Sequence, residues 1–169
     1  MTATRSDFSF EGQRPKLNSQ PILVAEDDPG DEFLLRDAIH QAGLDLQADY
    51  VCDGWDVVSY LQNLRPGQLP ALLLIDLNLP RLDGFAVLEW LQYRPEFRPA
   101  FVVAFSFSAL SSDIGRACSL GVDHYLVKPR DPPELVAAVR RMEPYWTEPR
   151  DRQIPFSHVS DEVRLAEAV

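Results

Sequence analysis

The run Leu72-Leu73-Leu74-Ile75, followed at once by Asp76, constrains the fold of this chain more than any other feature. An uninterrupted aliphatic run of this length is typical of a parallel strand covered on both faces. Ligands of open α/β sheets bind at the carboxyl ends of such strands, which is where Asp76 falls. Since Leu-Asn-Leu-Pro follows rather than a helical pattern, a functional role for Asp76 is favoured over a capping role.

Short apolar runs and amphipathic helical patterns alternate along the chain. The pattern predicts strands at 21–25, 49–52, 72–75, 101–106 and 123–127. It predicts helices at 31–42, 54–61, 85–91, 112–120 and 132–142. In the first helix Phe33 and Leu34 belong to the apolar pattern, and in the second we expect Trp55 to face inward. Five strand-helix repeats predict an α/β fold with a parallel sheet and helices on both faces.

Length and charge restrict the class of protein. The 169 residues fit one domain with additional segments at its ends. A net charge of -10 argues against direct binding to nucleic acid or to an anionic membrane, so protein or cation partners are expected. Cys52 and Cys118 lack metal-ligand spacing and predict free thiols in a reducing compartment. Without a membrane-length apolar run or a signal core, we expect a cytoplasmic protein.

The ends of the chain differ in composition from its centre. Residues 1–19 are polar and predict a flexible arm, and 20–145 hold the repeats. Residues 146–169 are too few for a separate domain, and a short helix is expected within 160–169. Packing of this extension on the core or on a second subunit is the alternative to disorder.

Polar side chains recur at the ends of the predicted strands. Glu26 and Asp27 follow the first strand, Asp76 the third and Lys128 the fifth, and Ser106 ends the fourth. In a parallel sheet these ends meet at one edge. Carboxylates with a lysine and a hydroxyl suit Mg²⁺ binding and phosphoryl transfer, and a carboxylate can accept a phosphoryl group as an acyl phosphate. The acidic triplet alone leaves cation binding and a solvated helix start equally open, and the neighbouring Asp28 is interpreted as a solvated residue.

Three motifs occur in a diagnostic order. They are Val24-Ala25-Glu26-Asp27-Asp28, then Ile75-Asp76-Leu77-Asn78-Leu79-Pro80 with Asp83-Gly84, then Tyr125-Leu126-Val127-Lys128-Pro129. Together they resemble the receiver domain of two-component response regulators, over about residues 20–143. The resemblance implies a flavodoxin-like (βα)5 fold, doubly wound, with strand order 2-1-3-4-5.

The resemblance also implies roles for the site residues. Asp76 would accept the phosphoryl group, and Lys128 would pair with the phosphoryl oxygens. Mg²⁺ (or Mn²⁺) would be held by Asp27, Asp76 and the backbone carbonyl of Asn78, with Glu26 binding through water. The peptide bond after Lys128 would be cis, a state available mainly before proline. No other cofactor is implied.

Further positions correspond to switching and tuning residues of that family. Ser106 takes the place of the switch hydroxyl, and Tyr125 that of the aromatic that swings inward behind it. Asn78 and Ser108 lie two residues beyond Asp76 and Ser106, where the family tunes hydrolysis of the acyl phosphate. Phe107 stands where the family usually has a small residue, so its ring is expected to restrict the phosphoryl site or the inward path of the tyrosine.

The function implied is that of a single-domain response regulator. It would take a phosphoryl group from a sensor histidine kinase or a phosphotransfer protein, and signal through phosphorylation-dependent protein contacts rather than act as an enzyme. The segment Glu26–Asp31 and the C-terminal extension resemble regulators that partner phytochrome-type kinases and commonly form homodimers, to which Tyr145-Trp146 would contribute. The alternative is a degenerate receiver that serves as an interaction scaffold without phosphorylation. An aspartate-nucleophile phosphatase is disfavoured because Asn78 stands where a second aspartate is needed.

Overall fold

The computed structural model describes residues 20–147, apart from 45, 66 and 98–99. A five-stranded parallel sheet in the order β2-β1-β3-β4-β5 forms its centre, which confirms the flavodoxin-like topology. The elements are β1 (Ile22–Ala25), α1 (Pro29–Gln41), β2 (Ala48–Val51), α2 (Gly54–Gln62), β3 (Leu72–Ile75), α3 (Gly84–Gln92), η1 (Pro95–Phe97), β4 (Phe101–Ser106), α4 (Ser111–Ser119), β5 (His124–Val127), α5 (Pro132–Met142) and α6 (Pro144–Thr147).

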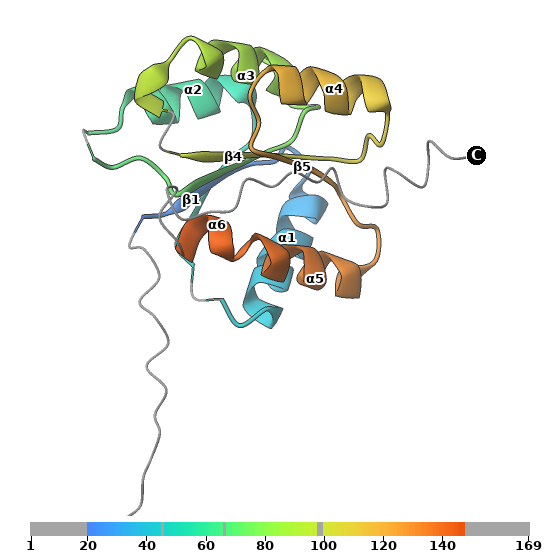
Figure 1. The fold of residues 1–169 in the computed structure, drawn as a ribbon. Helices are drawn as coiled ribbons and strands as arrows, with labels where there is room; N and C mark the ends of the chain where they lie inside the picture. Colours follow the sequence, from blue (N-terminus) through green and yellow to red (C-terminus); the bar gives the residue numbers. More distant parts are fainter. Residues whose placement is uncertain (1–19, 45, 66, 98–99, 148–169) are drawn as a thin grey trace, which may run out of the picture.

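Helices cover both faces of the sheet (Figure 1). On one face α1, α5 and α6 pack against Leu72 and Leu74 of β3. On the other, α2, α3 and α4 pack against Leu73 and Ile75. Because successive side chains of a strand point to opposite faces, both faces of β3 must be apolar. This is the physical origin of the uninterrupted aliphatic run.

The strands are in register at their carboxyl ends. Ala25 of β1 pairs with Ile75 of β3, and the next residue along β3, Asp76, donates its backbone N–H to the Ala25 carbonyl at 3.0 Å. Likewise Lys128 donates its backbone N–H to the Ser106 carbonyl at 2.8 Å. Ser106 at the end of β4 and the residues that follow β1, β3 and β5 therefore meet at one edge of the sheet.

Aspartates at this same edge start three of the helices. Asp28 accepts hydrogen bonds from the N–H groups of Gly30 and Asp31, at 2.8 and 3.0 Å, and caps α1. Asp53 caps α2 and Asp83 caps α3 in the same way. These carboxylates satisfy N–H groups that a helix leaves unpaired and lie at the positive end of its dipole.

The exposure of several apolar helix residues differs from the sequence-based expectations. Trp55 is 51% exposed, so its inward assignment was wrong. Phe33 and Leu34, which belong to the apolar pattern of the first helix, are 68% and 42% exposed. At 100° per residue, the buried stripes of α1 and α2 run through other positions and leave Phe33 and Trp55 well off them. Tyr145 is buried against the ring of Phe101. The helix expected in 160–169 and the arm 1–19 lie outside the described residues.

The peptide bond between Lys128 and Pro129 is trans, as is every other peptide bond of the described residues. The cis bond implied by the resemblance was therefore wrong for this structure. A trans bond before proline is favoured by about 0.5–1 kcal/mol, and in this geometry Lys128 still points into the site.

Gly84 is expected to tolerate no side chain, because a Cβ there would lie 2.3 Å from the carbonyl oxygen of Asp76. Gly84→Ala should lower the free energy of unfolding by about 2 kcal/mol or more, since neighbouring backbone must move. Urea denaturation measures the loss.

The matched control is Gly115→Ala. Gly115 lies inside α4, where an added Cβ meets nothing within 4 Å. Alanine should stabilise that helix by about 0.5–1 kcal/mol. Equal effects of the two substitutions would contradict the close approach at Gly84.

Candidate phosphoacceptor site

Four polar side chains at the carboxyl edge of the sheet are almost fully buried. Glu26, Asp76 and Lys128 are 4–6% exposed and Ser106 is 0% exposed. Burying an ionised group is costly unless it is paired and hydrogen-bonded. Their burial therefore requires strong mutual contacts, and the structure supplies them.

The ammonium group of Lys128 contacts three carboxylates. Its Nζ lies 2.5 Å from Asp76 Oδ2, 2.6 Å from Glu26 Oε2 and 3.0 Å from Asp31 Oδ2. An ammonium group has three N–H donors, so each carboxylate can receive one. The lysine thereby joins the ends of β1, β3 and β5 and the first turn of α1.

The charges of this group shift its pKa values. Burial alone would lower the pKa of Lys128, but hydrogen bonds and charges from Asp76 and Glu26 outweigh it and raise the pKa well above its usual value. Burial raises the pKa of Glu26, and the nearby Asp76 charge adds to this, against the lowering effect of Lys128. The lysine is thus a permanent cation within the site.

The carboxylate of Asp76 is held at both oxygens. Its Oδ1 accepts a hydrogen bond from the backbone N–H of Asn78 at 2.9 Å, and Oδ2 accepts from Lys128. The Asn78 side chain is exposed. These two contacts fix the orientation of the buried carboxylate.

Oxygen atoms suited to a cation gather beside the lysine. One carboxylate oxygen from each of Glu26, Asp27 and Asp76 lies within 4.8 Å of the other two. Asp27 is exposed while the other two are buried. An all-oxygen set of this kind fits a hard divalent cation such as Mg²⁺.

Two serines and a tyrosine continue the site beyond β4. The buried hydroxyl of Ser106 accepts a hydrogen bond from the backbone N–H of Ser108 at 3.3 Å. Tyr125 is 6% exposed, and its hydroxyl donates to the Ser108 carbonyl at 2.8 Å. Ser108 Oγ donates to Asp113 of α4 at 2.5 Å. The loop after β4 is therefore tied both to β5 and to α4.

Comparison with known proteins agrees with this geometry. The family model of the response regulator receiver domain matches residues 22–140 of the sequence. The chain belongs to the response regulator receiver domain family.

Relatives of this receiver include regulators of phytochrome signalling. Response regulator Rcp1 of Synechocystis is 30% identical over 144 residues, which cover 83% of this chain and 95% of Rcp1. The structure of the phosphorylated cyanobacterial phytochrome response regulator RcpA has 29% identity and a TM-score of 0.68, and the match covers 75% of this chain and 93% of RcpA. The Mn(2+)-bound form of Rcp1 has 30% identity and a TM-score of 0.67, with coverage of 76% and 95%. The receiver is thus similar to stand-alone, phytochrome-associated regulators.

Phe107 lies beside the lysine of the receiver. Its ring centroid is 4.9 Å from Lys128 Nζ, and the side chain is 47% exposed. Phe105 lies 5.7 Å from the same nitrogen. Tyr125 is already inside the protein, so in this conformation Phe107 does not keep it out. Both rings present their π systems to the ammonium group.

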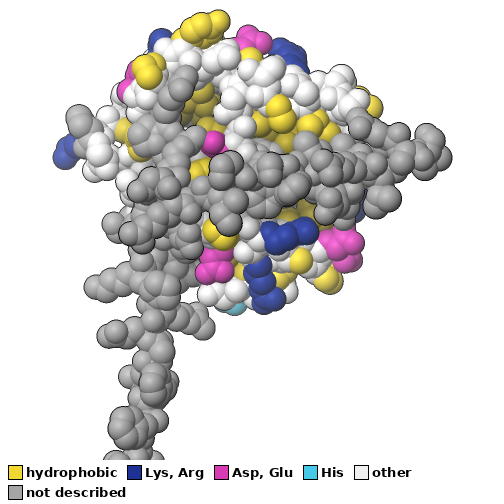
Figure 2. All heavy atoms as spheres, viewed as in Figure 1, with side chains coloured by type: hydrophobic (Ala, Val, Ile, Leu, Met, Phe, Trp, Pro, Cys, Tyr) yellow, Lys and Arg dark blue, Asp and Glu magenta, His cyan; other side chains and the backbone are white. Residues whose placement is uncertain are grey.

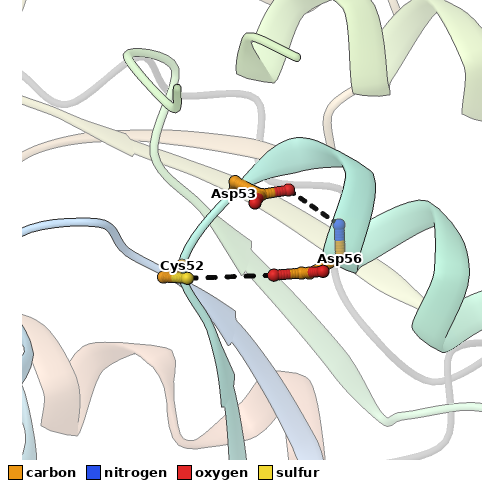
Figure 3. Close-up of side chains that lie close together, drawn as sticks. All are labelled: Cys52, Asp53 and Asp56. Carbon is orange, nitrogen blue, oxygen red and sulfur yellow. Dashed lines mark hydrogen bonds between the residues drawn. The ribbon is translucent and has the colours of Figure 1, made fainter. Parts of the chain in front are cut away.

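A second group of potential ligands, Cys52, Asp53 and Asp56, lies where β2 leads into α2 (Figure 3). Both oxygens of Asp53 are already used, since Oδ1 accepts from the Asp56 N–H at 2.9 Å and Oδ2 pairs with Arg81 at 2.7 Å. The thiol of Cys52 lies 3.8 Å from Asp56 Oδ2. This group joins α2 to the loop after β3, and its hydrogen bonds account for its arrangement.

Sequence reasoning missed one residue of the site, Asp31. The residue was noted only as part of the acidic segment that begins at Glu26. An aspartate in the first turn of a helix is common, because the helix dipole stabilises a negative charge there. The type and position of Asp31 therefore did not indicate a role in the site. Its contact with Lys128 joins residues 97 positions apart and depends on the sheet topology.

Replacing Lys128 by methionine should destabilise the protein by about 3 kcal/mol at pH 7 without added metal, because Glu26 and Asp76 would remain buried and unpaired. Asp76→Asn removes one charge as well, but leaves the lysine two carboxylates, and should cost much less. Urea denaturation measures both.

The cost of Lys128→Met should also depend on pH. Without the lysine, burial raises the pKa of Glu26 further above that of the unfolded chain, so the folded variant keeps a proton that the unfolded chain releases. Stability of the variant should therefore fall as pH rises from about 4.5 toward 7. A variant with wild-type stability across that range would contradict the pairing.

Proposed function

We propose that this receiver accepts a phosphoryl group on Asp76 from a sensor histidine kinase or a phosphotransfer protein. The observation that carries the proposal is the buried Asp76 carboxylate, oriented by Lys128 and Asn78 next to the oxygens of Glu26 and Asp27. A carboxylate held in a fixed orientation beside a cation is suited to attack phosphorus.

In the proposed reaction an oxygen of Asp76 attacks the phosphorus of a phosphohistidine. The new P–O bond forms as the P–N bond breaks, and the leaving imidazole keeps the electron pair and takes a proton from solvent. Lys128 holds an oxygen of the transferred group and offsets its charge. Water later hydrolyses the acyl phosphate. In this proposal the protein carries the phosphoryl group and does not act as an enzyme on other molecules.

The acidic oxygens would hold Mg²⁺ (or Mn²⁺). Asp27, Asp76 and the backbone carbonyl of Asn78 are proposed as direct ligands, and Glu26 as a ligand through water. When bound, the cation neutralises charge on the phosphoryl oxygens. The all-oxygen donor set supports this assignment.

Ser106 and Tyr125 are proposed to pass the change on to partner proteins. The Ser106 hydroxyl would turn from the N–H of Ser108 to a phosphoryl oxygen. Tyr125 already lies inside and donates to Ser108, so phosphorylation would stabilise its inward position and with it the arrangement of α4. The altered surface of α4, β5 and α5 would then select a protein partner.

The finer assignment is a phytochrome-type kinase as donor, with homodimerisation and a cytoplasmic location. The similarity to RcpA, a phytochrome response regulator, supports the assignment of the donor. Among the described residues visible in Figure 2, acidic, basic and hydrophobic side chains are interspersed, and the net charge of -10 suits a protein partner better than nucleic acid. Within the described residues, no helix is long and apolar enough to cross a membrane.

Incubation with Mg²⁺ and acetyl phosphate should add one acid-labile phosphoryl group to the wild type and none to Asp76→Asn. Intact-mass measurement follows the addition. Asp37→Asn is the matched control, because Asp37 is an exposed aspartate of α1 that bonds Gln41 away from the site. Absence of label on the wild type, also with phosphoramidate as donor, would favour the scaffold alternative.

A further inference from the structure

Asp31 is the partner of Lys128 that lies nearest to water. Its side chain is 25% exposed, whereas Glu26 and Asp76 are each less than 10% exposed. Asp31 sits in the first turn of α1, where its own N–H is held by the capping carboxylate of Asp28 at 3.0 Å. The carboxylate is therefore presented to the lysine by a rigid helix start, with one side open to solvent.

Phosphorylation would change the partners of Lys128 unequally. All three donors of the ammonium group are taken in the present structure. Once Asp76 is an acyl phosphate, its carboxyl group no longer carries a full charge, and the phosphoryl oxygens need a donor. Asp31 lies outside the group of oxygens suited to a cation, so it keeps both its charge and its hold on the lysine.

We propose that Asp31 is a positioning residue that holds the Lys128 ammonium in the unphosphorylated site and competes with the phosphoryl oxygens for it. The inference rests on the proposed function. The negative charge of Asp31 also repels an incoming phosphoryl group. Competition for Lys128 and charge repulsion therefore both weaken binding of the phosphoryl group. Asp31 thus limits how tightly the site holds a phosphoryl group.

Beryllofluoride, which occupies a carboxylate as a phosphoryl group does, provides the test. Titration by calorimetry at saturating Mg²⁺ should show tighter binding to Asp31→Asn than to the wild type, on the order of fivefold for a partly exposed charge. Asp31→Glu keeps the charge and should restore binding close to that of the wild type.

Glu32→Gln is the matched control. Glu32 occupies the same helical turn and carries the same charge, but it pairs with Arg36 at 2.7 Å and not with Lys128. A general effect of net charge or of the helix dipole would change both variants alike. Asp31→Ser is a second variant without the charge, and urea denaturation checks that each variant is folded.

The possible results are distinct. Binding to Asp31→Asn that equals that of Glu32→Gln, or is weaker than that of the wild type, would overturn the inference and leave the proposed function intact. A selective loss of Mg²⁺ affinity in Asp31→Asn, measured without beryllofluoride, would identify Asp31 as a cation ligand and also overturn it. If the wild type neither binds beryllofluoride nor takes phosphate from acetyl phosphate, the proposed function itself fails.

Discussion

The arrangement of the site depends on one positive charge, the ammonium group of Lys128. The lysine follows β5, and β4 separates that strand from β3, so its side chain must cross the end of β4 to reach Asp76. Ser106 ends β4 with a small, fully buried side chain, which leaves room for the crossing. Topology and side-chain size together allow a single lysine to join strands that are not neighbours.

This pairing leaves the site short of positive charge. Glu26, Asp31 and Asp76 surround one ammonium group, and Asp27 adds a further carboxylate nearby. Buried ion pairs contribute little net stability, because desolvation offsets much of their attraction. A need for stability therefore does not explain the burial, which supports the proposed binding of a cation and a phosphoryl group.

The sequence was sufficient for the sheet and for most of the site, for a simple reason. Strand ends of a parallel sheet share one edge, so Glu26, Asp76, Ser106 and Lys128 were brought together by topology alone. Asp31 was not found, because its role depends on the reach of a side chain from across the sheet. The contact between Asp31 and Lys128 arises from the three-dimensional arrangement of α1 and β5, and no local sequence pattern predicts it.

Other differences have equally physical causes. The apolar pattern of a helix does not define its angular phase to within one residue, which is why Trp55 was placed inside when it is exposed. Asp28 is exposed, as its interpretation as a solvated neighbour expected, and it also caps α1; the cap itself is recognised only when the first helical residue is known. The Phe107 ring lies beside Lys128, near the expected phosphoryl site, and sequence alone left open whether it would lie there or in the path of Tyr125.

Arg81, in the turn after β3, is a position at which two structural requirements restrict the possible substitutions. Its φ of 63° is the only positive value among the described residues other than glycine, and glycine or asparagine would adopt it more easily. Either replacement would, however, leave the buried carboxylate of Asp53 without its counter-charge. The positive φ thus favours glycine or asparagine at this position, whereas the ion pair with Asp53 requires a cation. A change at Arg81 should therefore be accompanied by a change at Asp53.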